Sequence, residues 1–179
     1  GESELGVNLN LVRTQKKTCN EVFETIVGEQ KEVRNNYNEM AVYVAEESEK
    51  KRLFSLRFRV FNDGVAFRYE VPPQPSFQRI IIEDELTEFN VDLNGQAWRI
   101  PAYQATKYEL NYEKWPVYEL RDAVHTPLTI ETNANKYLAI HEAALYNYGS
   151  MTLKLNQDKR LQADITPLSD GVKAYVDLP

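Results

Sequence analysis

The stretch from Leu53 to Val71, LFSLRFRVFNDGVAFRYEV, constrains the fold of this chain most. Apolar and polar side chains alternate on both sides of the turn signal Asn62-Asp63-Gly64, and a period of two residues is typical of a strand with one buried face. Glycine at position 64 tolerates the positive φ that a tight turn demands. The pattern predicts a β-hairpin with its aromatic-rich face in a core and its arginine-rich face in water. The aromatic-rich face comprises Phe54, Leu56, Phe58, Val60, Val65, Phe67, Tyr69 and Val71.

Shorter alternating segments flank the hairpin along the whole chain. They predict further strands over residues 6–12, 21–27, 38–45, 80–82, 125–130, 137–141, 150–155, 161–165 and 172–176. Residues 31–38 read as a polar connection, and 98–118 as a long, irregular, aromatic-dense loop of a kind that is often functional. About nine to twelve short strands without a long helix indicate an all-β fold, an antiparallel β-sandwich in one domain over residues 1–179.

Composition excludes several classes of function. The chain has 21 Lys and Arg against 27 Asp and Glu, a formal net charge of −6, and the charges are interspersed. No basic stripe therefore indicates nucleic acid or an anionic membrane, and no apolar run is long enough for a membrane span. Two histidines and the single Cys19 exclude a Cys/His zinc cluster. Cys19 itself is expected to be a semi-buried packing residue rather than a nucleophile.

Two groups of carboxylates could carry chemistry. Glu83, Asp84, Glu85 and Glu88 form the densest acidic cluster, which is a hydrated face or, less readily, a cation site. Glu142 is more unusual, because it lies within a mostly apolar and aromatic stretch. Such a carboxylate is costly unless it is paired, hydrogen-bonded or metal-bound. The residues alone favour a salt bridge or an N-cap-like contact over a metal, and both alternatives stay open.

Five blocks of sequence, in order, resemble the N-terminal domain of glycoside hydrolase family 97, the bacterial α-glucosidases and α-galactosidases. The hairpin segment NDGVAFRYE at 62–70 is one block, and the other four match the family's S-x-L-G, E-x-T-x-F, W…YE-x-x-Y and H-E-A-x-L-x-x-Y blocks. These four are Ser3–Gly6, Glu85–Phe89, Trp98 with Tyr108–Tyr112, and His141–Tyr148. Together they cover nearly the whole chain.

The resemblance implies a β-supersandwich of the galactose-mutarotase-like kind, followed in the full-length enzyme by a catalytic (β/α)8 barrel. In the family, the glutamate of the H-E-A block helps to bind calcium, and the matching position here is Glu142. No catalytic residue of the family falls within this chain, which resembles the central part of the domain. This chain by itself is therefore expected to be inactive, to lack calcium, and to expose strand edges through which copies could associate.

The resemblance also implies a role for the full-length protein. It would be a periplasmic or secreted enzyme of polysaccharide degradation, with an α-linked oligosaccharide as substrate and its own barrel as the partner of this domain. Three other functions stay open: a stand-alone carbohydrate-binding sandwich that uses the Trp98–Tyr118 segment as an aromatic platform, a mutarotase-like epimerase, and a purely structural sandwich. The epimerase is disfavoured because only His125 and His141 could join its acid/base chemistry.

Overall fold

The computed structural model describes residues 6–47, 49, 51–75, 78–104 and 109–177. Its regular elements are β-strands, apart from one 3-10 turn, η1, at Val117–Glu119. The chain clusters into two compact units, one that runs to Gln78 and takes in Asp177, and one that spans Arg79–Val176. The all-β, antiparallel prediction is confirmed. The expectation of a single domain stays a prediction.

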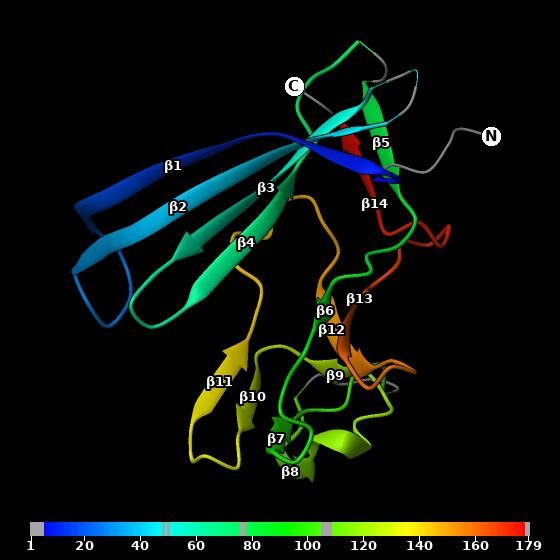
Figure 1. The fold of residues 1–179 in the computed structure, drawn as a ribbon. Helices are drawn as coiled ribbons and strands as arrows, with labels where there is room; N and C mark the ends of the chain where they lie inside the picture. Colours follow the sequence, from blue (N-terminus) through cyan, green and yellow to red (C-terminus); the bar gives the residue numbers. More distant parts are fainter. Residues whose placement is uncertain (1–5, 48, 50, 76–77, 105–108, 178–179) are drawn as a thin grey trace. The chain divides into compact units, whose positions relative to one another are not determined.

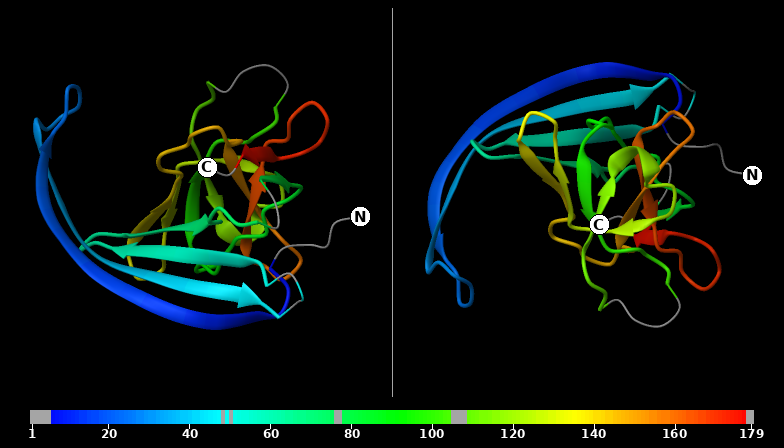
Figure 2. Two further views of the ribbon diagram at one scale, coloured as in Figure 1. Left: turned by 90° about the horizontal axis from the view of Figure 1, so that it is seen from above. Right: turned by 90° about the horizontal axis from the view of Figure 1, so that it is seen from below.

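The first unit is built on one antiparallel sheet with its four strands in sequence order (Figure 1). The strands are β1 (Leu9–Glu24), β2 (Glu32–Glu46), β3 (Leu53–Val60) and β4 (Val65–Glu70). β1 and β2 are far longer than the other two strands and bend along their length (Figure 2). Each strand pairs with the next one in sequence, as antiparallel neighbours joined by tight connections do.

Strands β3 and β4 are the hairpin predicted from the sequence. The Phe61 amide donates to the Gly64 carbonyl over 2.8 Å and closes the turn. Gly64 does not have a positive φ, so the expected use of glycine's conformational freedom is wrong. The register places Phe58 opposite Phe67, which confirms the apolar face.

The exposure of the two hairpin faces corrects the prediction. On the polar face, Ser55 is buried and only 22% of the Arg57 side chain is exposed. On the apolar face, Val65, Phe67 and Tyr69 are exposed. On the polar face, the reason is that Arg57 does not reach into water but lies between Glu39 of β2 and Glu70 of β4, which neutralise and cover it.

The long strands β1 and β2 were only partly predicted. The segments 6–12 and 21–27 belong largely to one continuous strand, and the supposed connection 31–38 forms most of the first half of β2. Almost every side chain of β1 is exposed, so hydrophobic alternation gives no signal there. Backbone pairing from Leu9↔Glu46 to Glu24↔Glu32 defines the strand instead.

The second unit contains two four-stranded antiparallel sheets and one strand pair (Figure 1). The first sheet has the order β11-β10-β7-β8, made of Tyr137–Ile140, Leu128–Glu131, Gln96–Arg99 and Glu113–Pro116. The second has the order β6-β13-β12-β9, made of Glu88–Phe89, Leu161–Ile165, Met151–Leu155 and Val124–His125. The pair joins β14 (Ala174–Asp177) to β5 (Arg79–Ile82).

The core of the second unit lies between its two larger sheets. One cluster of buried apolar side chains takes Ala97, Leu128 and Ile130 from the first sheet and joins them to residues of the second. The contributions from the second sheet and η1 include Val117, Val124, Leu153, Leu161 and Ile165. Two antiparallel sheets that share one core are the elementary unit of a β-sandwich.

Candidate functional site

Glu142 lies in the loop between β11 and β12. β11 ends at Ile140, and the chain then leaves the sheet, so that the half-buried Glu142 carboxylate meets the start of β12. Its Oε1 accepts a hydrogen bond from the Met151 amide over 2.8 Å. Within the described part of the chain, no hydrogen bond or ion pair reaches the second oxygen, Oε2. The carboxylate is thus held by one oxygen and offers the other.

The rest of this loop, residues 143–149, is fixed at its far end. The Tyr148 hydroxyl donates to Glu85 Oε2 over 2.9 Å. Ala144 and Asn147 adopt positive φ angles of 54° and 51°, which non-glycine residues adopt only where the surroundings impose them. The sequence predicted strands over 137–141 and 150–155 and none between them, and the structure has none there.

Gly149 ends the loop where no larger residue fits. A Cβ atom at this position would lie 2.6 Å from the Thr166 carbonyl oxygen and 2.7 Å from Ile165 Cγ2. Both distances are shorter than real contacts of a methyl group, and the backbone oxygen cannot move without moving its strand.

Gly149→Ala is therefore expected to destabilise the protein by about 1–3 kcal/mol, the usual cost of an overpacked site. Urea unfolding measures the effect. Gly64→Ala is the matched control, because nothing lies within 4 Å of a Cβ there and φ is not positive; its effect should stay within about 0.5 kcal/mol. Equal stability of the two variants would show that the 149 site relaxes freely.

The described residues contain no group of three or more His, Cys, Asp and Glu side chains that could hold a metal ion. Calcium takes about six to eight oxygen ligands. The chemistry of Glu142, a carboxylate with one uncommitted oxygen, fits a calcium ligand, but this part of the chain supplies only one. Further ligands would have to come from elsewhere in an intact enzyme.

The acidic cluster at 83–88 is mostly engaged in protein contacts. Glu85 accepts from Thr87 and Tyr148, and Glu88 pairs with Arg160 at 2.7 Å. The Arg160 guanidinium lowers the pKa of Glu88 below its usual value. These contacts leave the cluster as a structural surface rather than a cation site.

The aromatic segment 98–118 is more regular than the predicted loop. Trp98 lies on β7 and Trp115 on the neighbouring β8. The register places Trp98 opposite Lys114 and Trp115 opposite Ala97, so the two indoles are on opposite faces of the sheet. Tyr108 lies outside the described residues, as do Ser3, Glu4 and Leu5 of the first family block.

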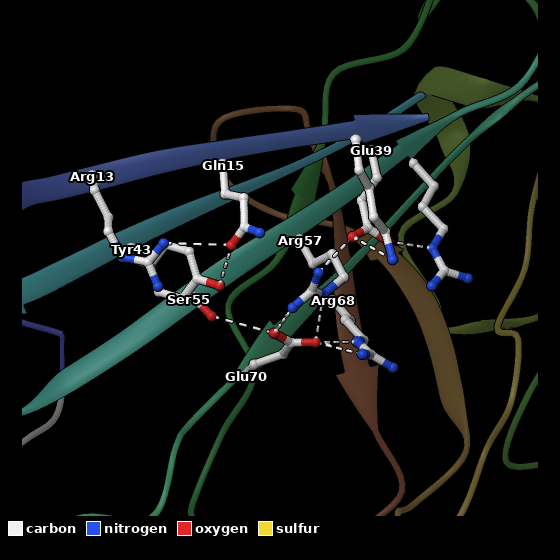
Figure 3. A network of polar contacts seen from close by, with 10 residues as sticks. Arg13, Gln15, Glu39, Tyr43, Ser55, Arg57, Arg68 and Glu70 are labelled. Carbon is white, nitrogen blue, oxygen red and sulfur yellow. Dashed lines mark hydrogen bonds and ion pairs between the residues drawn. The ribbon is translucent and has the colours of Figure 1, made fainter. Parts of the chain in front are cut away.

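The first unit carries a buried polar network that the sequence analysis missed (Figure 3). Arg57 binds the Glu70 carboxylate with both Nε and Nη2, over 2.7 and 2.8 Å, and donates through Nη1 to Glu39. Lys17 and Arg59 also pair with Glu39, whose side chain is only 3% exposed. Alternate polar residues on four neighbouring strands were the available signal, and opposite charges placed directly across strands commonly pair.

This network shifts the pKa values of its carboxylates. Hydrogen bonds from Arg57, and then from Arg68, outweigh burial and lower the pKa of Glu70 to about 2. Burial is the largest single influence on Glu39 and raises its pKa, but the hydrogen bonds from Arg59, Arg57 and Lys17 together outweigh it, so the net pKa is lowered. Both groups stay ionised at neutral pH.

No helix in the described ranges is long and apolar enough to cross a membrane. Comparison with known proteins gives a consistent assignment. The family model described as Glycosyl-hydrolase 97 N-terminal matches residues 1–176. A variant of a glycoside hydrolase family 97 enzyme from Pseudoalteromonas sp. strain K8 superposes with a TM-score of 0.89 at 36% identity, over 95% of this chain and 26% of that one.

Two further structures bear on the fold. A family 97 enzyme from the same strain, in complex with acarbose, gives a TM-score of 0.89 at 35% identity with the same coverage of 95% and 26%. A β-arabinopyranosidase gives 0.83 at 19% identity over 96% of this chain and 30% of that one, a likeness of fold alone. The chain spans about a quarter of the length of the family 97 enzymes it matches. The resemblance seen in the sequence blocks is confirmed, and this chain belongs to the N-terminal domain family of glycoside hydrolase family 97.

Proposed function

We propose that this chain is the non-catalytic N-terminal domain of a calcium-dependent glycoside hydrolase that acts on α-linked glucosides or galactosides. Its work is to support a catalytic domain and to contribute Glu142 as one calcium ligand. The family 97 neighbour in complex with acarbose supports α-linked sugars as the substrate class.

The observation that carries the proposal is the state of the Glu142 carboxylate. One oxygen is fixed by the Met151 amide, and the other is uncommitted within the described residues. The loop that carries it is anchored at Tyr148 and confined at Gly149, while Leu145 and Tyr146 within it are exposed. The loop is held at both ends, one carboxylate oxygen has no partner among the described residues, and apolar residues of the loop are exposed. Such a loop can place a metal-coordinating carboxylate against a neighbouring domain.

Each residue of the loop has its own role in this proposal. Met151 and Tyr148 hold the loop, so that Glu142 is in position before calcium binds. Calcium, when bound there, supplies charge that orients carboxylates and stabilises developing negative charge on substrate oxygens. The distance between the two catalytic carboxylates, which decides between inverting and retaining chemistry, is set by the catalytic domain.

Glu142→Gln in the full-length enzyme tests the proposal. Glutamine keeps an oxygen that can accept from the Met151 amide but removes the charge that calcium needs, so folding should survive. We expect calcium affinity, measured by titration calorimetry, to fall about tenfold or more. The stabilisation that calcium gives in thermal unfolding should fall with it.

Asp158→Asn is the matched control, because it removes one exposed carboxylate from the β12–β13 turn of the same unit. Its calcium affinity should equal that of the wild type. An unchanged calcium affinity in Glu142→Gln would remove this residue from the site. Loss of thermal stability in the absence of calcium would mean instead that the Met151 contact needs the full carboxylate charge.

A further inference from the structure

The sheet β11-β10-β7-β8 has one buried and one exposed face, and the exposed face has no role in the function proposed above. Ala97, Leu128 and Ile130 are fully buried on the inner face. The register places the neighbours of these residues on the outer face: Trp98 lies opposite both Thr129 and Lys114. Two residues along β10, Glu131 pairs with Tyr137 of β11.

Two aromatic side chains stand on this outer face. Tyr137 is 65% exposed and Trp98 is 38% exposed. They lie on β11 and β7, with β10 between them and an offset of two residues along the strands, which together separate their backbones by about 12 Å. A single sugar ring could not contact both side chains, whereas an oligosaccharide of several linked rings could.

The polar groups between the two aromatic residues are already ordered. Lys114 Nζ is 2.8 Å from Glu131 Oε2 and 5.2 Å from the centre of the Trp98 ring. The Lys114 ammonium, and then the Tyr137 hydroxyl, lower the pKa of Glu131 below its usual value. Glu131 therefore lies between the two aromatic positions, and the Lys114–Glu131 pair leaves the face with no local net charge.

We propose that this outer face, formed by Trp98, Lys114, Thr129, Glu131 and Tyr137, is a non-catalytic binding surface for an α-linked oligosaccharide. Pyranose rings have apolar C–H faces that stack on aromatic side chains, and their hydroxyl groups bond to carboxylate, ammonium and hydroxyl groups. A locally neutral surface matches a neutral sugar better than a charged ligand. The α linkage rests on the proposed function; the stacking geometry does not.

The surface differs from the aromatic platform expected from the sequence. That expectation confined the platform to Trp98–Tyr118, yet Trp115 lies on the opposite face of the sheet with Arg99 over its ring at 4.2 Å. Tyr137, beyond the segment, takes its place beside Trp98. Sheet register, rather than closeness in sequence, selects the residues.

Affinity electrophoresis of the full-length enzyme in gels that contain soluble amylopectin tests the proposal, with the active site saturated by a tight-binding inhibitor. Retardation that comes from this surface should persist under inhibition, because the inhibitor occupies the active site. Trp98→Ala and Tyr137→Ala should each weaken binding about tenfold, as loss of a central aromatic contact commonly does. Tyr118→Ala is the matched control, since Tyr118 is exposed but outside this surface.

Each outcome decides the proposal. Retardation that persists under inhibition and is lost in both platform variants, but not in Tyr118→Ala, supports it. Retardation that the inhibitor abolishes assigns all binding to the active site and overturns it, as does absence of retardation, which would mean that the remainder of the enzyme covers this face. Circular dichroism shows whether each variant is folded, and Trp98→Phe, which keeps a ring, should retain most of the binding. Enzyme assays on α- and β-linked substrates test the proposed function separately.

Discussion

Arg57→Met is expected to destabilise the protein by about 3 kcal/mol, the lower end of the cost of breaking a buried ion pair by removing one partner. Arg57 is the central cation of the network on the first sheet, bound through two nitrogens to Glu70 and through a third to Glu39. Methionine fills similar space without charge. In the variant, Glu39 keeps its ion pairs with Arg59 and Lys17, and Glu70 keeps its ion pair with Arg68. The decrease in the free energy of unfolding should therefore be smaller than for a buried carboxylate that has no partner left.

Urea unfolding at neutral pH measures this effect, and Arg68→Met is its control. Arg68 also pairs with Glu70, but its side chain is 65% exposed, and exposed pairs contribute about 0–1 kcal/mol. We expect the free energy of unfolding to fall by about 3 kcal/mol in Arg57→Met and by less than about 1 kcal/mol in Arg68→Met. Equal losses would show that water enters the network and screens both arginines alike.

The parts of the fold that the sequence predicted are those in which apolar and polar residues alternate. The β3–β4 hairpin and the β12–β13 hairpin alternate cleanly, and both lie where alternation placed them. The two long strands were predicted only in part. Almost every side chain of β1 is exposed, and the alternate residues that the first half of β2 buries include the polar Glu39. Backbone pairing defines these parts of the strands, and such pairing is not visible as hydrophobic alternation in the sequence.

The predicted segment 125–130 shows a second limit of sequence patterns. It divides into β9 and β10, which belong to different sheets. Alternation detects an extended chain but not the sheet to which it pairs, because pairing depends on residues distant in sequence. The same limit hid the partners of Trp98, since Tyr137 joins it only through the register of β10.

The candidate site was found only in part. The apolar surroundings of Glu142 in the sequence predicted a paired, hydrogen-bonded or metal-bound carboxylate and favoured a salt bridge or an N-cap-like contact. The structure shows a hydrogen bond from the Met151 amide to this carboxylate. Its role toward calcium came from the family blocks and stays a prediction. The two partners of Arg57 could not be predicted from the sequence. Glu39 and Glu70 are on different strands, and strand register, which the sequence pattern does not give, decides which carboxylate lies beside which arginine.

Stability is expected to fall as the pH drops from about 4.5 to about 2, with Glu70 as a principal cause. Its pKa is about 2 in the folded chain against an ordinary value of 4.5. The unfolded chain therefore takes up this proton first, and the contribution of Glu70 is present above pH 4.5 and lost as pH falls through its folded pKa. A shift of this size corresponds to about 3 kcal/mol, at about 1.4 kcal/mol per unit.

Urea unfolding at pH 7 and pH 3 isolates this contribution when the wild type is compared with Glu70→Gln. By pH 3, about 2 of the 3 kcal/mol should be lost in the wild type, while the variant has no such group to titrate. The free energy of unfolding of the variant should therefore fall about 2 kcal/mol less than that of the wild type. The loss that remains in the variant comes from other carboxylates with lowered pKa values, among them Glu39, Glu46 and Glu88. Parallel losses in the two proteins would mean that Glu70 is solvated in the folded state and that Arg57 acts mainly through Glu39.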